Sequence, residues 1–91
     1  MKVNPNSSIP LKAIAYIYKS KQNFAQALIF FEKLEKIEPK NIEILSDLGA
    51  IQLLLGKTQA GVKTLKTILS IDPKNMMALM LMLKLQEEKL I

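Results

Sequence analysis

The chain has 91 residues, of which 49% are hydrophobic and 23% charged, enough for one small domain with a modest core. It has no cysteine and no histidine, so disulfides, thiolate metal sites and the commonest catalytic base are excluded. Its basic residues are 13 lysines with no arginine, against eight carboxylates, for a net charge of +5, and without arginine a specific reader of nucleic-acid bases is not expected. We therefore expect a protein that is not an enzyme and needs no cofactor or metal.

Two features bear on where the chain works. Its longest apolar run, residues 76–83, spans eight positions, far fewer than the roughly 20 needed to cross a bilayer. The first residues are mostly polar, whereas a secretory signal needs an unbroken apolar core. We expect a soluble, cytoplasmic protein.

The lysines are scattered along the chain without a run of five or six, which is typical of a solvated surface. Weak adhesion to nucleic acid or anionic lipid is a lesser alternative. The lysines that would carry it are Lys33, Lys36, Lys40, Lys63, Lys66 and Lys74.

A short motif recurs at fixed spacing. It reads Glu-Pro-Lys-Asn at residues 38–41 and Asp-Pro-Lys-Asn at residues 72–75, with a fainter copy around Pro5. The prolines at positions 5, 39 and 73 lie 34 residues apart each time. A fixed period of this length is typical of stacked helical pairs, in which no pair can bury its apolar face alone.

The first unit is predicted to hold two helices. The first covers residues 8–21, and the second covers residues 24–37, begins after the capping residue Asn23 and stops before Pro39. The apolar residues of both fall three and four positions apart, which indicates one buried face on each helix. On the first helix they are Leu11, Ile14, Ala15 and Tyr18.

The second unit repeats this pattern in the same register. A helix over residues 42–55 is capped by Asn41 and closed by Gly56 in a left-handed conformation. Thr58 is placed to cap the partner helix, which runs to Ile71. A further helix is predicted over residues 76–91.

These positions resemble the tetratricopeptide repeat, a 34-residue helix-turn-helix unit with a large residue, Leu-Gly and an aromatic in its first helix, and Ala, an aromatic and Pro in its second. The first unit matches with Leu11, Ile14-Ala15, Tyr18, Phe24, Ala27, Phe31 and Pro39, and the second with Leu45, Leu48-Gly49, Gln52, Gly61, Leu65 and Pro73. Gln52 departs from the pattern, because it stands where an aromatic is preferred, and we expect it to weaken the packing of the second unit.

The resemblance implies an all-α solenoid of about two and a half repeats, with five helices. Its expected parts are a lead-in over residues 1–7, repeats over residues 8–41 and 42–75, and a partial repeat or capping helix over residues 76–91. Small residues are expected where paired helices approach closely. They are Ala15, Ala27, Gly49 and Gly61.

Members of this family hold ligands in a concave groove lined by the first helices. The expected groove residues are Ile9, Lys12, Ala13, Tyr16, Lys19, Glu43, Ser46, Asp47, Ala50, Leu53, Leu54, Met77, Met80, Leu81 and Lys84. We expect Tyr16 and Leu54 to point away from the packing between helices, and Asp47 to be solvated. Relatives that clamp a chaperone's C-terminal carboxylate use five polar residues, of which only Lys12 is matched, so this role is disfavoured.

The last predicted helix is apolar nearly all round, whereas solenoids normally end in a helix with a polar outer face. Three interpretations stay open: a self-association surface, a chain whose next helix is missing, and a docking site for another protein. The residues expected to mediate oligomerisation are Met76, Met77, Met80, Leu81, Leu83 and Leu85.

The leading hypothesis is a protein-interaction module that holds a peptide or helix in an apolar groove, as a scaffold or chaperone does. The alternative is a structural protein that assembles with itself, and a homo-oligomer is expected.

Overall fold

The computed structural model describes residues 8–89, which form five α-helices. The expected lead-in and the last two residues of the fifth predicted helix lie outside this range. The helices are α1 (Ser8–Ser20), α2 (Phe24–Ile37), α3 (Ile42–Leu54), α4 (Thr58–Ile71) and α5 (Met76–Glu87). The prediction of an all-α solenoid is confirmed.

Asparagine starts three of the helices. The side chains of Asn23, Asn41 and Asn75 accept hydrogen bonds from the backbone N–H three residues on, at 3.4, 3.2 and 2.9 Å. These bonds satisfy N–H groups that have no partner inside the helix. The predicted caps at Asn23 and Asn41 are confirmed. The predicted cap at Thr58 is wrong, because Thr58 is already the first helical residue of α4.

The turn between α3 and α4 depends on one glycine. Gly56 has a φ of +78°, in the left-handed region that glycine enters without the steric cost of a Cβ. Its predicted conformation is confirmed, and it lets the chain reverse direction within three residues.

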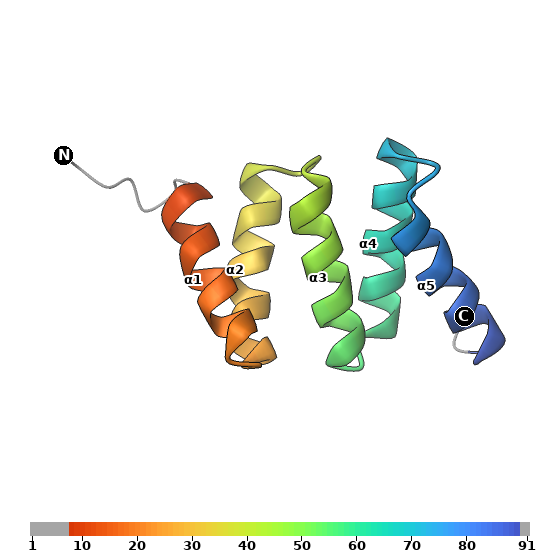
Figure 1. Cartoon of the computed structure of the whole chain (residues 1–91), viewed down its shortest axis with the longest axis horizontal. Helices are drawn as coiled ribbons and strands as arrows, with labels where there is room; N and C mark the ends of the chain where they lie inside the picture. The colour runs from red at the N-terminus through yellow and green to blue at the C-terminus, as the bar shows by residue number, and fades with distance from the viewer. Residues whose placement is uncertain (1–7, 90–91) are drawn as a thin grey trace.

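The helices stand side by side in an extended row, each antiparallel to the one before (Figure 1). The described part measures 50 × 26 × 17 Å along its principal axes. We call α1, α3 and α5 the first helices and α2 and α4 the second helices, because α1 packs with α2 and α3 with α4 as pairs. The pairs meet through α2 and α3, while α5 packs mainly on α4.

Helix α3 is buried on two sides. Its residues Ile44, Leu48 and Ile51 join a core with α1 and α2. Its residue Leu45 joins a second core with Leu65 of α4 and with residues of α5. A helix between two cores needs apolar residues on both faces, so α3 is the element that joins the two repeats into one body.

The α3–α4 crossing is close because it is built on glycine. A Cβ on Gly61 would lie 2.6 Å from Cδ2 and 2.8 Å from Cγ of Leu53. A Cβ on Gly49 would lie 3.3 Å from Cγ2 of Thr64. The expectation of small residues at this contact is confirmed.

Gln52 is accommodated by a buried polar partner. The Thr64 hydroxyl donates to Oε1 of Gln52 at 2.6 Å, and both residues are buried. At the equivalent place in the first pair, the ring of Tyr18 stacks on Phe30 at 5.7 Å. The second pair thus replaces an aromatic contact with a hydrogen bond, which satisfies a polar group that would otherwise be costly to bury.

Candidate functional site

A hollow of about 420 Å³ lies between the first helices α3 and α5. We call it the α3–α5 hollow. Its lining residues are Ala50, Leu53, Leu54, Thr58, Leu81, Lys84, Leu85 and Glu88. Five of the eight were predicted from the sequence as groove residues.

Helical spacing brings these side chains together. Ala50 and Leu54 are four residues apart on α3, and Leu81, Lys84 and Glu88 follow at intervals of three and four along α5 and its end, so each set shares one helix face. Leu54 is 64% exposed, which leaves most of an apolar side chain available to a ligand. The hollow therefore offers an apolar surface with one lysine and one glutamate among its lining residues.

Three lining residues were not among the predicted groove residues, and one of them, Leu85, was expected at the oligomerisation surface instead. Thr58 was assigned to a helix cap, and nothing in its local sequence indicates that the start of α4 faces the hollow. Glu88 could have been found, because it lies seven residues after Leu81 and four after Lys84, on the same face.

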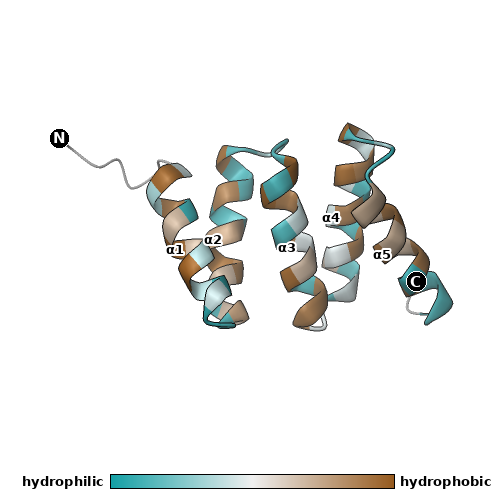
Figure 2. Cartoon of the chain, in the orientation of Figure 1, coloured by the Kyte–Doolittle hydropathy of each residue, from teal (hydrophilic) through white to brown (hydrophobic). Residues whose placement is uncertain are grey.

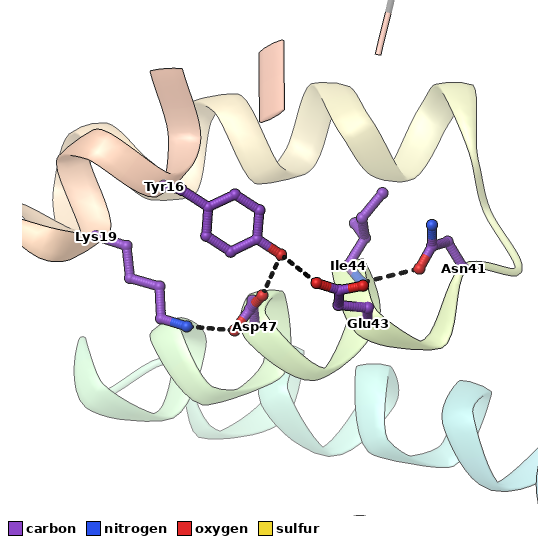
Figure 3. A network of polar contacts seen from close by, with 6 residues as sticks. All are labelled: Tyr16, Lys19, Asn41, Glu43, Ile44 and Asp47. Carbon is purple, nitrogen blue, oxygen red and sulfur yellow. Dashed lines mark hydrogen bonds and ion pairs between the residues drawn. The ribbon is translucent and has the colours of Figure 1, made fainter. Parts of the chain in front are cut away.

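Between the first helices α1 and α3, polar side-chain contacts take the place of an apolar hollow (Figure 3). The Tyr16 hydroxyl lies 2.7 Å from Oδ2 of Asp47 and 3.3 Å from Oε1 of Glu43. The Lys19 ammonium pairs with Oδ1 of Asp47 at 2.5 Å. We call these four residues the Tyr16 bridge. It joins α1 to α3 directly through side-chain contacts.

The Tyr16 bridge corrects two expectations. Asp47 is not a solvated groove residue: its side chain is 17% exposed and is engaged by Lys19 and Tyr16. Tyr16 does not point away from the helix packing, because its ring meets Phe31 edge-on, with centroids 5.4 Å apart. Burial, reinforced by the bond to Asp47, raises the pKa of the Tyr16 phenol well above its usual range, so the hydroxyl stays a donor at neutral pH.

The remaining predicted groove residues do not reach the hollow. Lys12 pairs with Glu38 at the end of α2, at 3.3 Å. Ile9 and Ala13 are exposed on α1, away from the hollow's lining. Met77 is partly buried against the second core. The expected continuous apolar groove is thus divided into a polar, bridged half at α1 and an apolar half at α5.

Helix α5 also exposes a face on the side opposite its contact with α4. We call Met76, Leu79, Met80 and Leu83 the outer face of α5; they are 66%, 43%, 64% and 56% exposed. Figure 2 shows hydrophobic residues along α5 up to its polar last turn. Leu85 must be removed from the expected oligomerisation surface, because it is only 7% exposed and packs in the second core. Met77 and Leu81 are partly covered by the same core.

Paired antiparallel helices stacked in a row, with an apolar hollow between successive first helices, define a helical-repeat protein. The family model described as "Tetratricopeptide repeat" matches residues 19–85. The chain belongs to the tetratricopeptide repeat family, whose fold is in general a scaffold for protein interactions.

The chain is similar to one solved structure in particular. It is the crystal structure of a Bacteroides ovatus protein to which protein binding has been provisionally ascribed, with a TM-score of 0.75 and 25% sequence identity. The match covers 86% of this chain and 40% of that one, so the chain spans two fifths of that protein's length. No curated protein matches the chain. Among the helices within residues 8–89, none has the length and apolar character needed to cross a membrane.

Proposed function

We propose that the chain is a non-enzymatic protein-interaction module that holds an apolar segment of a partner protein in the α3–α5 hollow. The observation that carries the proposal is the hollow itself, with Leu54 largely exposed and Leu81 beside it. Family membership supports a protein as the ligand. A role as scaffold or chaperone in the cytoplasm is part of the same proposal.

The mostly apolar lining of the hollow, between two helices, favours a short amphipathic helix as the bound segment. Such a helix presents apolar anchors three and four residues apart to a groove. The Tyr16 bridge occupies the α1 half, so the anchors enter at the α5 half. Lys84 and Glu88 line the hollow and offer one charge of each sign to polar residues that flank the anchors.

The test is partner capture from the native source by two matched variants. Leu54→Lys places a charge in the hollow, and Ile29→Lys makes the same change at an exposed isoleucine of α2, outside the hollow. Burying a leucine contributes roughly 1.5 to 3 kcal/mol, so Leu54→Lys should weaken capture of the partner by about tenfold or more. Ile29→Lys should leave capture unchanged. Equal capture by both variants would refute the proposed site.

Self-association is a second function that we propose, as a structural role or as a means of presenting two hollows at once. It is supported by the outer face of α5, where four large apolar side chains lie together. Contiguous exposed apolar patches of this kind are typical of interaction surfaces.

A further inference from the structure

We propose that two copies of the chain pair through the outer face of α5, antiparallel and related by a two-fold axis that passes between Leu79 and Met80. This inference rests on the proposed self-association and goes beyond it, because it fixes the occupant of the face, its direction and its register.

The 34-residue period shows what the outer face corresponds to. Leu79 is equivalent to Leu45 of α3 and Leu11 of α1, and both of these are buried. Leu83 is equivalent to Gly49 and Ala15, which are buried as well. In α1 and α3 these positions pack on the second helix of the same pair. Leu79 and Leu83, which make up half of the outer face of α5, therefore stand at positions that a helix covers in both complete pairs, whereas the equivalents of Met76 and Met80 are only partly buried.

A second helix like α2 or α4 does not fit there at the usual distance. At the α3–α4 crossing, one added Cβ on Gly49 would already come within 3.3 Å of Thr64. At α5 the equivalent position carries the whole side chain of Leu83. The covering helix must stand farther off and fill the wider gap with large side chains, since the separation of packed helices follows the residues at the contact.

Another α5 meets this requirement. The outer face consists of positions 76, 79, 80 and 83, whose spacing of three, one and three reads the same in both directions. In an antiparallel pair, Met76 lies opposite the partner's Leu83, and Leu79 opposite the partner's Met80. A two-fold interface needs this self-complementarity. The methionines add flexible side chains that fill irregular gaps.

The charges around the face permit the pairing. In this register the end of α5, where Lys84, Glu87, Glu88 and Lys89 carry two charges of each sign, lies opposite residues 70–75 of the other copy, where Asp72 and Lys74 carry one charge of each sign. Neither end of the pair therefore brings together an excess of one sign. This differs from the chain as a whole, which carries +5. Because the helix is only 12 residues long, the interface falls at the small end of specific interfaces, below about 1,200 Å² in total. We expect a dissociation constant in the micromolar range.

The experiment combines solution mass with disulfide trapping, for which the cysteine-free chain is a clean background. Sedimentation of the unmodified chain at about 100 micromolar should give a dimer. Mixed under oxidising conditions, Met76→Cys and Leu83→Cys chains should form a 76–83 disulfide at least about tenfold faster than either variant links to itself. Ile29→Cys, exposed on α2, measures the rate of random collision.

The outcomes separate the two proposals. A dimer with fast 76–83 linkage supports the pairing, and Leu54→Lys should leave this dimer intact because it changes only the hollow. A dimer whose fastest linkage is 76–76 or 83–83, or whose linkage stays at the Ile29→Cys rate, overturns the antiparallel pairing while self-association stands. A monomer at this concentration overturns both.

Discussion

The closest contact between α3 and α4 gives the sharpest stability prediction. A Cβ built on Gly61 would lie 2.6 Å from Cδ2 and 2.8 Å from Cγ of Leu53, distances that real side chains do not tolerate. Cγ is not the free end of the side chain, so Leu53 cannot escape by moving a single methyl group. The Gly61→Ala substitution must therefore displace Leu53 or separate the two helices.

Two opposing terms set the size of the effect. Overpacking a close contact costs roughly 1 to 3 kcal/mol. Replacing glycine by alanine inside a helix returns about 1 kcal/mol through helix propensity. We expect Gly61→Ala to lower the free energy of unfolding by up to about 2 kcal/mol. Gly61→Leu should cost at least about 3 kcal/mol, because a whole side chain must be placed there.

A double-mutant cycle isolates the contact. In a Leu53→Ala background the clashing atoms are gone, so Gly61→Ala should change from destabilising to stabilising by about 1 kcal/mol. Urea unfolding followed by circular dichroism measures all four variants. If Gly61→Ala costs the same in both backgrounds, Leu53 is not the neighbour that makes glycine necessary and the reasoning fails. Gly56→Ala, with open space but a φ of +78°, is the control for backbone strain without overpacking.

Three further predictions concern polar contacts. Tyr16→Phe keeps the ring on Phe31 but removes the bond to Asp47, and should cost about 1 kcal/mol in urea unfolding; no loss would mean that the Tyr16 bridge does not stabilise α1. Thr64→Val leaves the buried Gln52 without its partner and should cost about 1 to 3 kcal/mol, most of which the added change Gln52→Leu should recover if the cost comes from an unpaired polar group. The hydrogen bond from Asn41, helped by Lys12, lowers the pKa of Glu38. The stabilisation that ionised Glu38 gives to the fold is therefore complete above the ordinary glutamate pKa of about 4.3. It is lost as the pH falls through the lower pKa that Glu38 has in the folded chain. Glu38→Gln should flatten the fall in melting temperature over that acid range, and an unchanged profile would show that Glu38 does not contribute to it.

The fold could be predicted because one period governs the whole chain. The 34-residue repeat of Pro39 and Pro73 sets the turns between the repeats, and the asparagine that ends each of these two turns, Asn41 or Asn75, caps the next helix. The apolar spacing then fixes which face of each helix is buried. These signals are local or periodic, and they do not depend on the distances between helices.

The details of the site depend on those distances, which no single-helix pattern contains. Tyr16 and Asp47 were placed in the groove from their helix faces, yet α1 and α3 come close enough for the two side chains to bond. Leu85 was counted as surface because α5 is apolar all round, so its sequence alone did not show which side meets α4. The same uniformity made α3 easy to predict as a helix but concealed that it serves two cores.

The most direct test of the central claim is a chemical-shift map of the chain with a bound amphipathic helix. The probe is a synthetic peptide with leucines three and four residues apart, titrated into a Met80→Glu variant so that the outer face of α5 is impaired. We predict that the largest shifts fall on Ala50, Leu54 and Leu81, and that Leu54→Lys abolishes them. Shifts centred on α2 and α4, or shifts at the hollow that survive Leu54→Lys, would contradict the assignment of the α3–α5 hollow as the binding site.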